Sequence, residues 1–145
     1  MKDKNAENIM EWRKAILKLP DQKFFDLMTF YLGEIKTPFN KQNLIDDLSA
    51  FLRKESVQEK IFLRISISET YLIACILLLQ KATFEFLRKF FKNDCNQYQL
   101  QELLANLEQR LIIFTQEKNG ENIYTVNPYL LRKFEPLAKL ETFLV

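Results

Sequence analysis

The chain has 145 residues, 48% of them hydrophobic and 28% charged, and its 21 Lys and Arg against 19 Asp and Glu leave a net charge of +2. This apolar share is large enough to build the core of one domain, or of a helical region fused to a compact second unit, and it excludes a disordered chain. Because opposite charges are spread evenly along the sequence, strong non-specific attraction to nucleic acid or to an anionic membrane is not expected.

Two helices are predicted in the first 33 residues. The spacing of apolar residues predicts a helix over 6–19, and Pro20 followed by Asp21 favours the start of a second helix over 21–33. Apolar side chains surround most of the second helix, which is typical of a helix covered on more than one side. Internal packing and contact with a second copy in a homodimer both explain this pattern.

Two further helices complete the N-terminal region. Asn40 is the expected cap of a third helix over 41–52. Ser56 and Glu59 have the spacing of a capping box, which predicts a short fourth helix over 56–65.

An apolar helix is predicted over 68–80, with Ser66 and Glu69 at capping-box spacing just upstream. Its longest unbroken apolar run, 71–79, is far shorter than the ~20 residues that a membrane span requires. Thr83 is the expected cap of a short helix, whose inward-facing side chains are predicted to be Phe84, Leu87, Phe90 and Phe91.

The next segment predicts an amphipathic helix that leads into a β-hairpin. Leucines recur at helical spacing at positions 100, 103, 104, 107 and 111. The β-type runs "LIIFTQ" and "NIYTV" follow, and Asn119-Gly120 between them is the strongest short-range hairpin signal. Pro128 is expected to end the second strand. A last helix is expected to break near Pro136, and the apolar end "LETFLV" suggests a fragment of a longer protein.

This order of helix, short helix, amphipathic helix and hairpin, together with "NLEQRLIIF…NGENIYTVNP", resembles the winged-helix family over residues 66–127. Arg110 stands where many members have glycine, so the exit of the third helix is expected to differ. More loosely, a helical region followed by such a unit is similar to accessory domains of helicases and transcription-related proteins. The expected fold is mainly α, with an N-terminal helical cap (1–65) on a winged-helix unit with a C-terminal extension (66–145), packed as one body.

The resemblance implies a candidate recognition surface on the third helix of the unit. The face opposite its leucines carries Tyr98, Gln101, Glu102, Ala105, Glu108 and Gln109. In many winged-helix proteins this helix enters the major groove, where glutamines suit adenine. However, two carboxylates and no Lys or Arg on this face oppose contact with phosphates. We consider three interpretations of this face. A solvated polar surface is favoured first, a protein-docking surface second and DNA recognition third.

Positive charge is gathered at Arg88, Lys89 and Lys92 on the short helix, with Lys81, Arg132 and Lys133 as a candidate extension. An ordinary charged helix surface explains this cluster, as does a site for an acidic partner or a nucleic-acid backbone. The predicted wing offers only Lys118, between Glu117 and Glu121, which indicates a structural role.

No catalytic, metal or cofactor site is expected. The chain has no histidine, no glycine-rich phosphate loop and no CxxC or HExxH motif. The adjacent Asp46 and Asp47 point about 100° apart on a helix and form no acid/base pair. Cys75 is expected in the core and Cys95 in a turn, with a disulfide between them conceivable but weakly supported.

These observations favour a cytoplasmic protein that is not an enzyme. The first hypothesis is a non-catalytic winged-helix interaction or scaffold module with a protein partner. The alternative is a DNA-binding winged-helix protein or transcription-related regulator.

Overall fold

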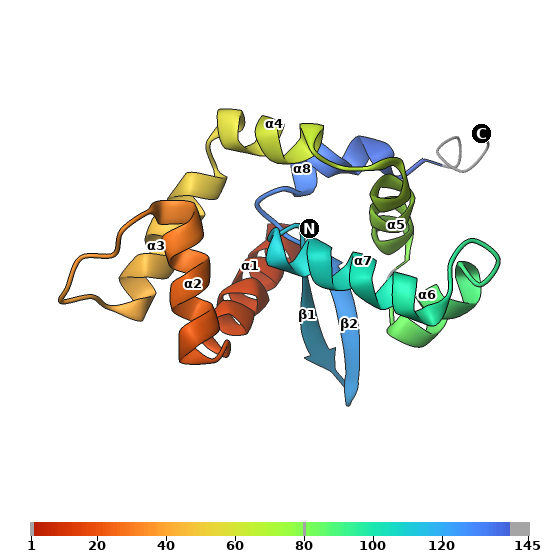
Figure 1. Cartoon of the computed structure of the whole chain (residues 1–145), viewed down its shortest axis with the longest axis horizontal. Helices are drawn as coiled ribbons and strands as arrows, with labels where there is room; N and C mark the ends of the chain where they lie inside the picture. The colour runs from red at the N-terminus through yellow and green to blue at the C-terminus, as the bar shows by residue number, and fades with distance from the viewer. Residues whose placement is uncertain (1, 80, 140–145) are drawn as a thin grey trace.

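The computed structural model describes residues 2–79 and 81–139. These residues contain eight α-helices, one 3-10 helix and one β-hairpin (Figure 1). The expectation of a mainly helical fold with one two-stranded sheet is confirmed. The elements are α1 (Lys2–Leu17), α2 (Asp21–Leu32), α3 (Lys41–Leu52), α4 (Glu55–Leu63), α5 (Ile67–Leu78), α6 (Phe84–Phe90), α7 (Gln97–Gln109), β1 (Ile113–Lys118), β2 (Glu121–Val126), α8 (Leu131–Phe134) and η1 (Glu135–Leu137). The segment "LETFLV", at 140–145, lies outside the described residues.

Side-chain caps start four of the described helices, namely α3, α5, α6 and α7. Asn40 Oδ1 accepts a hydrogen bond from the Asn43 amide at 3.2 Å, and Ser66 with Glu69 forms the expected capping box. The capping box predicted at Ser56 is wrong, because α4 begins at Glu55. The carbonyl of Lys54 already accepts from the amides of Val57 and Gln58, which places Ser56 inside the first turn, where it cannot cap.

The segments on either side of Asn119-Gly120 pair as predicted, but the first strand begins at Ile113 rather than at Leu111. β1 and β2 run antiparallel, with Ile113 opposite Val126 and Lys118 opposite Glu121. Asn119 and Gly120 have φ angles of 53° and 80°, the left-handed values that a two-residue type I′ turn requires. At the other edge of the sheet, the Tyr124 amide donates to the Ala82 carbonyl at 2.9 Å, so the loop before α6 adds a bridge to β2.

Two apolar clusters form the interior. One is built from α5, α6, α7, the hairpin and α8. The other is built from α1, α2 and α3, and it also contains Leu111, Phe114 and Tyr129 from the second half of the chain. The Trp12 and Tyr129 rings meet edge to face with centroids 5.1 Å apart. The N-terminal helices are therefore packed directly on the exit of α7 and on the hairpin.

A fully buried amide fixes this junction. Asn127 Nδ2 donates to the Leu111 carbonyl at 2.8 Å, and its Oδ1 accepts from the Tyr129 amide at 3.0 Å. Gln58 Nε2 donates to the carbonyls of Leu52 and Tyr129 at 2.8 and 3.0 Å. Since these buried polar groups are satisfied, the turn after β2 holds α3, α4 and α7 in one arrangement.

The short helix α6 corrects one prediction. Leu87 and Phe91 are buried as expected and Phe84 is half-buried, but Phe90 is 51% exposed. Positions 87 and 91 lie one turn apart on the inward face, whereas residue 90 projects to the side of it. Phe86, on the same short helix, is also exposed, at 45%.

The two cysteines are free thiols, so the conceivable disulfide is not formed. Cys75 is a core residue as predicted, and burial raises the pKa of its thiol to about 11. Cys95 is half-buried, and burial together with the nearby charge of Asp94 raises the pKa of its thiol.

In the described part of the chain, no single helix is long and apolar enough to cross a membrane. Taken together, α4 and α5 meet that requirement by length and composition, but they are bent by 118° relative to each other.

Candidate functional site

The leucine row of α7 faces the interior and thereby leaves a polar face outward. Leu100, Leu104 and Leu107 are buried, and Leu103 is half-buried. The opposite side consists of the exposed residues Tyr98, Gln101, Glu102, Ala105, Glu108 and Gln109, which we call the polar face of α7. A second capping box, Asn96 with Gln99, starts this helix; the Asn-x-x-Gln spacing is its signal in the sequence.

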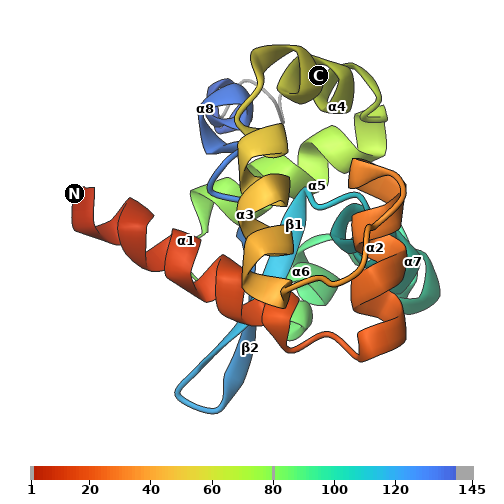
Figure 2. The same ribbon diagram turned by 90° about the vertical axis from the view of Figure 1, so that its left-hand side faces the viewer.

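Helix α2 lies beside the C-terminal half of this polar face (Figure 2). The Tyr31 hydroxyl of α2 donates to the Gln109 carbonyl at 3.4 Å. In contrast, Tyr98 at the other end of α7 is 83% exposed. The polar face is therefore divided into an open N-terminal half and a C-terminal half that forms one wall of a groove.

This α2–α7 groove encloses about 690 Å³ and also borders α1 and β1. Its floor is apolar and comprises Trp12, Ile16, Leu111, Ile113 and Phe114. Its rim carries the charged residues Lys23, Asp26 and Glu108 and the ring of Phe30, which is 81% exposed. An apolar floor with a few polar groups at the edge is the usual composition of a binding cleft.

Glu108 has an unusual environment on the groove wall. Its Oε1 accepts a hydrogen bond from the Thr115 hydroxyl of β1 at 3.1 Å. Although part of the side chain stays accessible, burial raises the pKa of the Glu108 carboxyl, and this outweighs the opposing effects of the Thr115 hydrogen bond and the Lys23 charge. Burial raises the pKa of Tyr124, and the charge of the Glu108 carboxylate adds to this shift. The charged form of Glu108 is therefore less well solvated than an ordinary surface carboxylate.

Replacing Glu108 with glutamine is expected to raise the melting temperature at pH 7 by up to about 2 °C, because solvent screening keeps the effect small. A raised folded-state pKa means that stability falls as pH rises from the ordinary value of 4.5 through the folded-state value. The gain should thus disappear near pH 3.5 in thermal melts. The matched control is Glu102→Gln on the open half of the same helix; an equal, pH-dependent gain there would contradict the argument.

The predicted basic patch of Arg88, Lys89 and Lys92 is exposed at the end of α6. Arg88 forms an ion pair with Glu85 at 2.9 Å, which reduces the charge that the patch presents. Lys133 does not extend the patch, because it is paired with Glu59 of α4 and lies over the ring of Phe62, 5.8 Å from its centroid.

The hairpin tip presents the expected mixed charge. Lys118 lies opposite Glu121 and next to Glu117, and all three are exposed. One ammonium between two carboxylates offers a phosphate backbone no net attraction.

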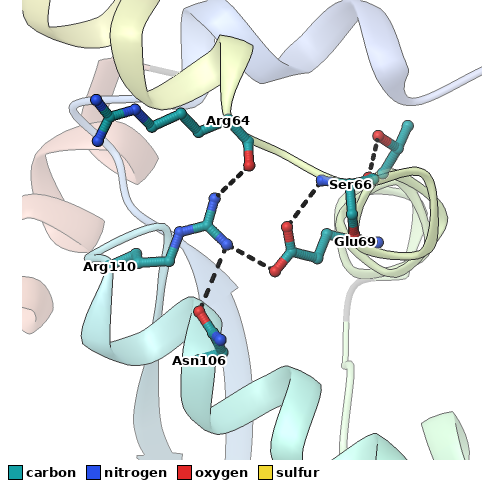
Figure 3. A network of polar contacts seen from close by, with 6 residues as sticks. Arg64, Ser66, Glu69, Asn106 and Arg110 are labelled. Carbon is teal, nitrogen blue, oxygen red and sulfur yellow. Dashed lines mark hydrogen bonds and ion pairs between the residues drawn. The ribbon is translucent and has the colours of Figure 1, made fainter.

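Sequence reasoning noted Arg110 only as a departure from glycine and missed its contacts (Figure 3). Its guanidinium donates to Glu69 Oε2 at 2.6 Å, to the Arg64 carbonyl at 3.0 Å and to Asn106 Oδ1 at 3.5 Å. Glu69 accepts from the Ser66 amide at 2.9 Å through its other oxygen. This network ties the α4–α5 turn to the end of α7, and its polar groups are occupied in holding the fold.

Burial alone raises the pKa of Glu69, but the hydrogen bonds from Ser66 and Arg110 and the Arg110 charge together outweigh burial and hold it below its ordinary value. Glu69 is therefore a stabilised carboxylate, which does not suit an acid or base that must exchange protons near neutral pH.

Elsewhere, the described residues contain no group of three or more His, Cys, Asp or Glu side chains placed to hold a metal ion. A second cavity, of about 470 Å³, lies between α5 and the α6–α7 turn and is bordered by Cys95. The raised pKa of that thiol lowers its nucleophilicity at neutral pH.

A family model described as an "N-terminal domain" matches residues 1–53, the segment that contains α1, α2 and α3. No curated protein and no solved structure matches the chain.

Proposed function

We propose that residues 66–127 form a winged-helix unit, that residues 1–65 are a helical cap on it, and that the chain is a non-catalytic module that binds another protein. The order α5, α6, α7, β1, β2 supports the winged-helix assignment, as does the bridge from Ala82 to Tyr124 beside the hairpin. The N-terminal core, which includes Leu111, Phe114 and Tyr129, supports the description of the first helices as a cap.

The position of α2 is the observation that carries the choice of a protein partner. A recognition helix in the major groove needs its polar face open along the length that contacts bases. Here α2 borders the half of α7 that carries Ala105, Glu108 and Gln109. The open half adds the carboxylate of Glu102, and the hairpin tip adds those of Glu117 and Glu121. DNA would meet an obstruction and several unfavourable charges on this side.

The rival function is a DNA-binding, transcription-related role with Arg88, Lys89 and Lys92 at the phosphates and Gln101 at a base edge. The exposure of all three cations is the observation that favours it. Gln109, its second candidate for base contact, lies instead in the α2–α7 groove, next to Tyr31.

A salt titration with labelled duplex DNA separates the two functions. The expected result is no binding above background even at low salt, because few cations are placed to displace counterions. Binding that is detectable at low salt, falls steeply with added salt and disappears in the Arg88→Ala/Lys89→Ala double variant would overturn the proposed function. The matched control is Lys18→Ala/Lys36→Ala, which removes the same charge from exposed sites in the N-terminal region.

A further inference from the structure

We infer that the α2–α7 groove is the docking site of the protein partner and takes an amphipathic peptide segment, with apolar residues on one face and a lysine or arginine beside them. This inference rests on the proposed function and assigns it a place on the molecule and a partner chemistry.

The size and floor of the groove suit an apolar peptide face. The volume of about 690 Å³ lies within the range of binding clefts, and the floor comes from the apolar side chains of α1, β1 and the α7 exit. At the rim, the Phe30 ring is 81% exposed and packs edge to face on Tyr31, with centroids 4.9 Å apart. A helix or extended segment in the groove would cover this ring, as apolar anchors do in helix-in-groove recognition.

Charge at the rim selects a basic partner. The groove is lined by the carboxylates of Asp26 and Glu108 against the ammonium of Lys23. Arg110 also borders the groove, but Glu69 neutralises it at 2.6 Å. The local balance is therefore negative in a chain whose net charge is +2.

Glu108 is the residue best placed to determine the charge of the partner that binds. Among the described contacts, its hydrogen bond from Thr115 uses Oε1, which leaves Oε2 able to accept from a second donor. The poor solvation that raises the pKa of its carboxyl would be relieved by a cation from the partner. An acidic peptide would instead place a like charge against a partly desolvated carboxylate, which disfavours binding.

The test is selection of a displayed library of random sixteen-residue peptides on the full chain at pH 7. We expect the selected peptides to combine Leu or Phe at helical spacing with Lys or Arg. In titrations followed by fluorescence anisotropy, Glu108→Gln and Phe30→Ser should each raise the dissociation constant of the best peptide by about tenfold. Phe86→Ser, which removes another exposed phenylalanine on α6, away from the groove, is the matched control and should leave the affinity unchanged.

NMR spectra of the wild-type chain with the same peptide supply a second measurement that needs no variant. Amide shifts should concentrate on α2, the C-terminal half of α7 and β1. The inference is overturned if no peptide is selected, if the shifts lie elsewhere, or if Glu108→Gln leaves the affinity unchanged. It is also overturned if sedimentation shows a dimer that Phe30→Ser dissociates, because a second copy would then occupy the groove.

The two proposals can fail separately. Peptides that bind at another surface, with no binding to duplex DNA, would remove the groove assignment and leave the proposed function in place. Salt-dependent DNA binding that requires Arg88 and Lys89 would remove the proposed function itself.

Discussion

Replacing Leu111 with alanine is expected to lower the free energy of unfolding by about 3 kcal/mol, whereas replacing it with glycine lowers it by only about 2 kcal/mol. Both substitutions remove a side chain that is 4% exposed and packs in the N-terminal core. Only glycine also relieves the backbone, because Leu111 has a φ of 61°, the left-handed conformation that is unfavourable for residues with a Cβ atom.

The hydrogen bonds at the end of α7 explain why this conformation persists. The Leu111 amide donates to the Glu108 carbonyl at 3.0 Å, and the Ile112 amide donates to the Leu107 carbonyl at 2.9 Å. This is the Schellman arrangement, whose left-handed position is usually glycine. Leucine at this position gains contacts with the N-terminal helices, which offset the cost in the backbone.

Leu104 is the matched control for the Leu111 variants, because it is also buried but lies inside α7. At this site glycine should be more destabilising than alanine by about 1 kcal/mol, the ordinary order in a helix interior. Urea denaturation at 25 °C measures all four variants. If glycine is as destabilising as alanine at position 111, or more so, the left-handed backbone does not carry the expected cost.

Local signals in the sequence predicted the elements around this site well. The leucine row predicted from Leu100 to Leu111 placed α7, and Asn119-Gly120 placed the hairpin turn, because both depend on residues close together in the chain. The inclusion of Leu111 in this helical row was wrong, because α7 ends at Gln109 and Leu111 has left-handed backbone beyond it. The departure from glycine near Arg110 was also visible. The left-handed backbone at Leu111 was not predicted, since the core that Leu111 joins is built from helices about 60 to 100 residues earlier in the sequence.

The candidate site was predicted in part, for the same reason. Helical periodicity correctly placed Glu108 and Gln109 on the side of α7 away from its leucines. Periodicity within one helix says nothing about a second helix that packs beside it, so the wall formed by α2 could not be foreseen. The shifted pKa of Glu108 follows from that packing and from Thr115 on the neighbouring strand.

The exposed Phe90 and the uncapped start of α4 show the limit of local patterns on short elements. A helix of seven residues has barely two turns, so the apolar pattern that includes Phe90 overestimates the width of the buried face of α6. At α4, the spacing of Ser56 and Glu59 suits a cap, but the Lys54 carbonyl starts the helix earlier.

Replacing Arg110 with methionine is expected to lower the free energy of unfolding at pH 7 by about 3 kcal/mol. The Glu69 side chain is 7% exposed, so the variant leaves a buried carboxylate without its cation, and the Arg64 carbonyl loses a donor at 3.0 Å. Methionine retains most of the apolar length of the arginine stem, which limits the loss of packing. The control is Arg88→Met, which breaks the exposed pair with Glu85 and should have a much smaller effect on the free energy of unfolding, because solvent screens that pair.

The effect of Arg110→Met should depend on pH in a defined direction. Because the folded-state pKa of Glu69 lies below its ordinary value of 4.5, the stabilisation by Arg110 is fully present above that value and is lost as pH falls through the folded-state pKa. Urea denaturation from pH 7 to pH 3 should therefore show wild type and variant converging at the acidic end, as Glu69 becomes protonated and neutral. A difference that stays constant over this range would mean that Arg110 acts through its packing and through its hydrogen bond to the Arg64 carbonyl rather than through its charge. The same titration on Glu69→Gln, which keeps the shape of the carboxyl group without its charge, should show a smaller loss of stability from pH 7 to pH 3 than wild type, because this variant lacks the titrating carboxylate.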